Sequence, residues 1–199
     1  MGAHESMEHA EHAEHASSSN RNIALLIAVI ALFLALSEML GKGAQTLSIS
    51  KNVEASNLWA FFQAKNLRRQ ALRLQIDQLE IMRDGDPNLP ATTRAAVEAK
   101  IADYKAQDTL LTSDKARNEG LDELFVRAKA LEVERDTAME RDPYFDYGEA
   151  FLQIAIVLGG VAIISGGSAV LVSSLVVAAL GALMTLNGFT LLVPMPFIG

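Results

Sequence analysis

The sequence predicts an all-α membrane protein, with three transmembrane helices and a long antiparallel helical hairpin inserted between the first and the second. Two apolar stretches and the segment between them lead to this fold class. Residues 150–199 contain no Lys, Arg, Asp, Glu or His, and a second apolar run covers residues 23–36. The segment 42–149 holds sixteen of the seventeen basic and nineteen of the twenty-four acidic residues, well mixed and in a helical pattern.

The C-terminal apolar stretch is too long for one span. A helix of that length would extend about 75 Å, whereas the hydrocarbon core of a bilayer is about 30 Å thick. Residues 150–199 are therefore expected to form transmembrane helices 2 and 3, joined by a turn at residues 166–168. Four glycines are expected to allow close helix contact in lipid: Gly159, Gly160, Gly181 and Gly188.

Residues 22–44 are predicted to form transmembrane helix 1, preceded by a His- and Glu-rich tail at residues 1–21. A cleaved signal peptide is the alternative interpretation. It is disfavoured because the tail carries Glu5, Glu8, Glu11 and Glu14, whereas a secretory leader begins with a basic region.

Residues 45–141 are predicted to form a helical hairpin stalk with a turn at 84–91, where Asp, Gly and Pro cluster. Thr92 or Thr93 is expected to cap the second arm, and Ser113 and Gly120 suggest a break inside it. Residues 142–149 are expected to be an interfacial linker, with Tyr and Phe rings at the depth of the headgroups. The first arm has two adjacent apolar stripes, so a second helix leaves part of its surface uncovered, and other copies of the chain are the simplest candidate to cover it.

Four groups of residues are candidates for function. Trp59, Phe61 and Phe62 are read as packing residues, with a partner or lipid contact as the alternative. Gln153 and Asn187 are expected to join helices or to line a pore; Ser173, Ser174 and Thr185 are expected to line the same pore or to bond to carbonyls of their own helix. Glu38 is an intramembrane acid expected to pair with Lys42 at the helix end. His9, His12 and His15 form a compositional metal-binding signal.

Four segments together resemble an uncharacterised bacterial membrane-protein family, domain of unknown function 4337. They are the Glu-His-Ala tail, residues 31–41, the Trp-centred run 56–65 and the Asp-Tyr-Gly-Glu sequence at 146–149. The similarity covers nearly the whole chain. It implies an inner-membrane protein with a helical insert and brings no assigned catalytic residue.

The sequence predicts a non-enzymatic protein without a cofactor, since phosphate-loop and nucleophile–base motifs are missing and cysteine is absent. The sequence has no basic block that would indicate nucleic-acid binding. We expect a homo-oligomeric, multi-pass protein of the bacterial inner membrane whose stalk assembles with itself or docks to a larger membrane complex. The alternatives are a small oligomeric channel or transporter and metal binding by the tail. The basic residues flanking the stalk predict that it is cytoplasmic.

Overall fold

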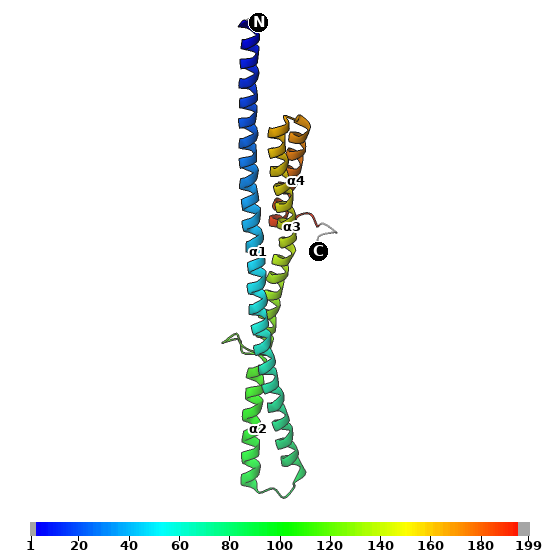
Figure 1. Ribbon diagram of the computed structural model, residues 1–199. Coiled ribbons are helices and arrows are strands. Elements are labelled where there is room, and N and C mark those ends of the chain that lie inside the picture. Colours follow the sequence, from blue (N-terminus) through cyan, green and yellow to red (C-terminus); the bar gives the residue numbers. More distant parts are fainter. Residues whose placement is uncertain (1–2, 195–199) are drawn as a thin grey trace. The chain divides into compact units, whose positions relative to one another are not determined.

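The computed structural model describes residues 3–194, and describes side chains from Arg21 onward. This part of the chain forms four helices and no strand: α1 (Ala3–Gly85), α2 (Ala91–Thr112), α3 (Leu121–Ser165) and α4 (Ser168–Thr190) (Figure 1). The predicted all-α fold class is confirmed. Three of these helices, α1, α3 and α4, are long and apolar enough to cross a membrane.

The breaks between helices follow local chemistry. After α1, the Asp86 carboxylate accepts a hydrogen bond from the Asn88 amide at 2.9 Å, which closes an Asx turn. The predicted turn at 84–91 therefore exists, with residues 86–90 outside the helices. The helix that follows begins at Ala91 behind Pro90, without a side-chain cap. The expected cap at Thr92 or Thr93 is therefore wrong, because Pro90 already supplies a fixed φ and no amide donor.

The expected break near Ser113 and Gly120 is confirmed, since α2 ends at Thr112 and α3 begins at Leu121. Glu123, in the first turn of α3, reaches back to accept hydrogen bonds from the Ser113 hydroxyl at 2.6 Å and the Asp114 amide at 3.0 Å. A side chain at position 120 would collide with this arrangement, because a Cβ there would lie 2.4 Å from the Asp114 nitrogen. Only glycine fits at this position.

Residues 142–149 are helical and belong to α3, although the sequence predicts a linker there. Pro143 lies inside the helix, where its missing amide removes one backbone hydrogen bond. Packing compensates, because Tyr144 and Phe145 are 5% and 3% exposed. These two rings are therefore core residues of the helix packing, while Tyr147 is exposed.

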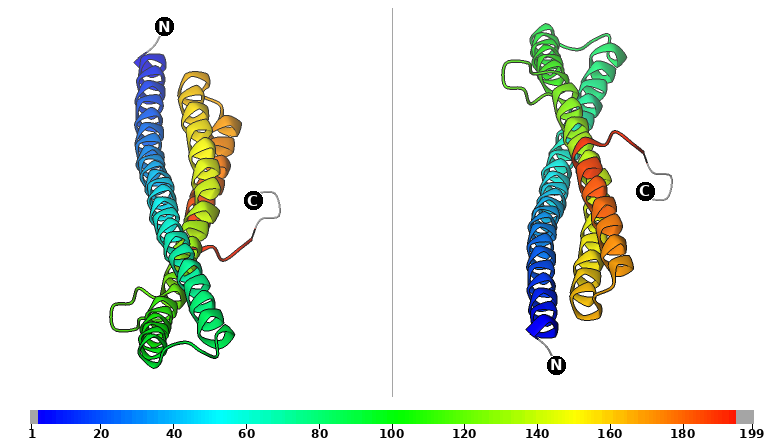
Figure 2. Two further views of the ribbon diagram at one scale, coloured as in Figure 1. Left: turned by 90° about the horizontal axis from the view of Figure 1, so that it is seen from below. Right: turned by 90° about the horizontal axis from the view of Figure 1, so that it is seen from above.

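The chain divides into two compact units. The apolar unit comprises residues 1–48 and 136–199, and the charged unit comprises residues 49–135. In the apolar unit, the N-terminal part of α1 packs with the C-terminal part of α3 and with α4 (Figures 1 and 2). Ile30, Leu152 and Ala155 form its buried centre, with Leu26 and Val177 packed against them.

In the charged unit, the C-terminal part of α1 packs against α2 and against the start of α3 (Figure 1). Ile76 of α1 is buried with Val97 and Ile101 of α2. Two ion pairs near this core follow an antiparallel order. Arg73 pairs with Asp108, and Glu80 pairs with Lys105, which lies earlier in the chain.

Candidate functional site

Buried polar contacts connect the three helices of the apolar unit. Ser37 of α1 is fully buried and donates a hydrogen bond to the Phe145 carbonyl of α3 at 3.1 Å. The Thr185 hydroxyl of α4 lies 3.0 Å from both Ser37 Oγ and the Gly181 carbonyl. Where water is scarce, a buried hydroxyl needs such partners. This cluster therefore fixes the relative register of α1, α3 and α4.

Glycines make this approach possible. A Cβ on Gly148 would lie 2.6 Å from Thr185 Oγ1, and one on Gly181 would lie 2.8 Å from Leu152 Cγ and 2.9 Å from the Gly148 carbonyl. Gly159 and Gly188 also lie at tight contacts, whereas Gly160 has open space around it. The expectation of close helix contact is thus confirmed for Gly159, Gly181 and Gly188, and it is wrong for Gly160.

A second buried hydrogen bond joins two helices, whereas Ser174 was expected to line a pore or to bond within its own helix. The Ser174 hydroxyl of α4 donates to the Ala155 carbonyl of α3 at 2.7 Å and is fully buried. Ser37 was missed in the sequence, although its spacing of four from Gly41 is a small-residue pattern typical of helix contacts in lipid. The same spacing relates Gly181 to Thr185 and Ala155 to Gly159.

Gln153 and Asn187 do not hydrogen-bond to another helix of the chain. Gln153 is exposed on α3 and donates a hydrogen bond to Glu149, one turn earlier on the same helix, at 2.8 Å. The Asn187 amide closes the end of α4. Its Nδ2 donates to the Val193 carbonyl at 2.8 Å, and its Oδ1 accepts from the Val193 amide at 2.9 Å. The hydrogen bonds of both residues therefore stay local within one chain.

The predicted pair of Glu38 and Lys42 is present, with a distance of 2.5 Å between the Lys42 amine and the carboxylate. Both side chains are largely exposed, as expected for a pair where a helix leaves the hydrocarbon. The side chains of His9, His12 and His15 lie outside the described residues. From Arg21 to Pro194, no group of three or more His, Cys, Asp or Glu could hold a metal ion.

The aromatic run of α1 splits into two faces in the charged unit. Trp59 packs edge-on against Phe62 and against Phe125 of α3, with ring-centre distances of 5.4 and 5.6 Å, and the Phe62 ring lies tilted to Phe125 at 6.5 Å. The indole nitrogen of Trp59 donates to Glu132 at 2.8 Å. Hydrogen bonds from Lys129 and Trp59 hold the pKa of Glu132 below its ordinary value. The prediction that these rings pack against a further helix is confirmed for Trp59 and Phe62.

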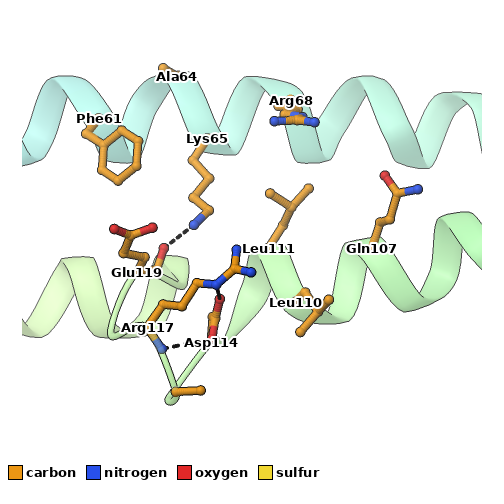
Figure 3. A pocket seen from close by; sticks show the side chains of 11 residues that line it. Phe61, Ala64, Lys65, Arg68, Gln107, Leu110, Leu111, Asp114, Arg117 and Glu119 are labelled. Atoms are coloured by element: carbon orange, nitrogen blue, oxygen red, sulfur yellow. Dashed lines mark hydrogen bonds and ion pairs between the residues drawn. The ribbon is translucent and has the colours of Figure 1, made fainter.

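Phe61 faces away from this cluster and is 45% exposed. It lies at one end of a groove of about 710 Å³ between α1, α2 and the loop that precedes α3 (Figure 3). The Lys65 amine crosses the groove to the Glu119 carbonyl, and Arg117 pairs with Asp114 at 4.0 Å (Figure 3). Leu110 and Leu111 add apolar surface. The groove is thus amphipathic, with most of its charges satisfied within the chain.

Ion pairs also shape the acid–base behaviour of the charged unit. Arg73 contacts both oxygens of Asp108, at 2.8 and 3.0 Å. These hydrogen bonds hold the pKa of Asp108 below its ordinary value. The bonds from Ser113 and from the Asp114 amide lower the pKa of Glu123 in the same way. These carboxylates are held ionised by structural partners, which is the usual origin of such shifts outside a catalytic site.

Long apolar helices with glycines and hydroxyls buried between them are typical of helical proteins that cross a membrane, and three helices of this chain are long and apolar enough to do so. The chain belongs to the family described as a domain of unknown function (DUF4337), whose model matches residues 19–191. The resemblance seen in the sequence is thereby confirmed. No curated protein and no solved structure matches the chain.

Proposed function

We propose that this protein is a membrane-anchored assembly element, in which α1, α3 and α4 cross the membrane and the charged unit is a helical stalk that binds other copies or a larger membrane complex. The observation that carries the proposal is exposed apolar surface on the charged unit. Leu67, Leu110, Val126 and Val133 are each at least 60% exposed, although this unit has the composition of a segment in water.

The antiparallel order of the contacts between α1 and α2 supports a hairpin in the segment that separates the proposed spans. The three spans supply a fixed anchor, because their packing is held by Ser37, Thr185 and the glycines around them. A contiguous group of exposed apolar side chains marks a contact surface, whereas single apolar residues scattered over a surface are normal. Binding between the stalks of two or more copies is the simplest function that accounts for the anchor and the exposed apolar surface.

Mass measurement of the intact chain in a mild detergent tests the proposal. We expect a discrete assembly of more than one copy, and a monomer at all accessible protein concentrations would refute self-assembly. Co-purification from native membranes would separate a pure homo-oligomer from a subunit of a larger complex, because a second protein then appears in fixed ratio.

We also propose that the spans are those of a bacterial inner membrane and that the stalk is cytoplasmic. Lys42, Lys51, Lys129, Arg135 and Arg141 flank the stalk, whereas Arg21 alone precedes the first span. Because the chain has no cysteine, an A102C variant in α2 gives a single labelling site. We expect labelling by an impermeant maleimide only after the cells are opened, and labelling of intact cells would reverse the orientation.

A channel is the second candidate, and exposed polar groups on α3 favour it. Gln153 and Glu149 hydrogen-bond to each other at 2.8 Å, and Gln153 is exposed on a stretch that is otherwise apolar. Polar groups facing lipid are costly, so a neighbouring copy or a water path would relieve them. Ion flux into liposomes that is lost in the Gln153→Leu variant would support a channel, while unchanged flux would refute this role for Gln153.

A further inference from the structure

The outer face of α1 in the charged unit carries a regular repeat. We define the outer seam as ten residues that alternate in steps of three and four, all of them exposed: Ser50, Val53, Asn57, Ala60, Ala64, Leu67, Ala71, Leu74, Gln78 and Ile81. It extends over about four and a half heptads, beyond the three to four that indicate a coiled coil.

The outer seam lies opposite the face that the chain itself uses. Ala55 and Ile76 are buried, and each lies two residues from members of the seam. Two residues correspond to a rotation of about 200° around the helix. The helices that cover Ala55 and Ile76 therefore leave the seam open along its length.

Exposure of the seam is costly only in this part of α1. The same spacing continues toward the N-terminus through Leu25, Leu32 and Met39, which are also exposed, but these lie in the proposed span, where lipid covers them. Leu67, Leu74 and Ile81 are 67%, 64% and 72% exposed in a segment of mixed charge. In water, such apolar surface is unfavourable. A protein helix is the partner that matches a heptad repeat.

The residues of the seam suit a two-stranded parallel pair. Val53, Ala60, Leu67, Leu74 and Ile81 share the d position of the heptad, and Ser50, Asn57, Ala64, Ala71 and Gln78 share the a position. Leucine at d is typical of two-stranded parallel coiled coils, and a polar Asn at an a position specifies register at a cost in stability. The flanking positions carry only Glu54, Arg68 and Asp77 as charges, so no row of like charges opposes the pairing.

We infer that the occupant of the outer seam is the same seam of a second copy, packed in parallel. This rests on the proposed function, because copies anchored through the same span point the same way. In a parallel pair each residue meets its counterpart. Asn57 then pairs with the Asn57 amide of the second copy, whereas an apolar partner would leave it unsatisfied.

Single cysteines test the inference, since the chain has none of its own. In the L67C and L74C variants the thiols of two copies come within disulfide reach across the seam. The matched control is A102C, on an exposed position of α2. Under mild oxidation in native membranes, we expect covalent dimers from L67C and L74C at least about tenfold faster than from A102C. Equal rates in all three, or no dimer from either seam variant, would overturn the inference.

A second variant tests the apolar contact directly. In the L67K/L74K double variant, two exposed residues become charged, so the fold of the single chain should persist by circular dichroism while the assembly mass falls. The control A102K places a lysine at an exposed position of α2 outside the seam and should retain the mass. Retained mass in L67K/L74K, or a seam occupied by a different protein in fixed ratio, would refute pairing of copies and leave the proposed stalk function intact. A monomeric wild-type chain would refute both.

Discussion

Gly181 is the position where a single added methyl group should test the packing of the apolar unit. A Cβ there would lie 2.8 Å from Leu152 Cγ, 2.9 Å from the Gly148 carbonyl and 3.1 Å from the Leu152 nitrogen. Two of these three atoms are backbone atoms, which cannot move aside as a flexible side chain can. Alanine at this position must therefore push α3 and α4 apart.

The expected size follows from two opposing effects. Replacing glycine by alanine inside a helix gains about 1 kcal/mol in helix propensity, and overpacking a tight contact costs about 1 to 3 kcal/mol. Gly160→Ala is the matched control, because the same gain applies on α3 and no atom lies within 4 Å of the new Cβ. The difference between the two variants isolates the steric cost, about 1 to 3 kcal/mol in favour of Gly160→Ala.

Fluorescence energy transfer provides the assay. Cysteines at the exposed positions Leu32 of α1 and Leu183 of α4 carry the dyes, and loss of transfer during titration with a denaturing detergent reports separation of the helices. We expect the midpoint of Gly181→Ala to fall below that of Gly160→Ala. Coincident midpoints, or a more stable Gly181→Ala variant, would show that α3 and α4 do not approach each other at this point.

Three further outcomes concern the charged unit. Gly120→Ala should destabilise it by about 2 kcal/mol, because the new Cβ would lie 2.4 Å from the Asp114 nitrogen; thermal unfolding by circular dichroism measures this, and an unchanged midpoint would contradict the loop geometry. Trp59→Ala should cost about 2 kcal/mol, roughly half the value for a fully buried ring, since Trp59 is half-buried against Phe125; a loss of only a few tenths would mean that the ring cluster is unimportant. Acid should also destabilise the unit, because the folded-state pKa values of Asp108 and Glu123 lie below their ordinary values of 3.8 and 4.5. Their contribution is complete above those values and is lost as the pH falls through the lower folded-state values, so a stability that rises on acidification would refute the assignment.

Prediction from the sequence succeeded where the cause was local. Pro90 and the Asp-Gly-Asp sequence before it end α1 through backbone restrictions that act within a few residues. Ser113 and Gly120 marked the next break for the same reason. The packing of Trp59 and Phe62 was predictable because large rings on one face of a helix in a charged segment require a partner.

Prediction failed where the outcome depended on a neighbouring helix. Residues 142–149 were expected to form a linker, but Tyr144 and Phe145 pack tightly enough to keep the helix continuous through Pro143. Gln153 and Asn187 were expected to join helices or to line a pore; within a single chain each hydrogen-bonds to a residue one or two turns away, so neither joins two helices of the same chain. Neither outcome is visible in hydropathy or spacing.

The sequence alone determined that this chain is helical, that three of its helices are apolar enough to cross a membrane, and that a charged segment separates the first from the second. These properties follow from composition and periodicity, which can be read along the chain without knowing which helices are in contact. Only the tertiary structure decided which small residues lie at the contacts. Ser37, Gly148 and Thr185 meet although they are far apart in the chain, because close packing depends on the shape of both surfaces and not on the character of either one.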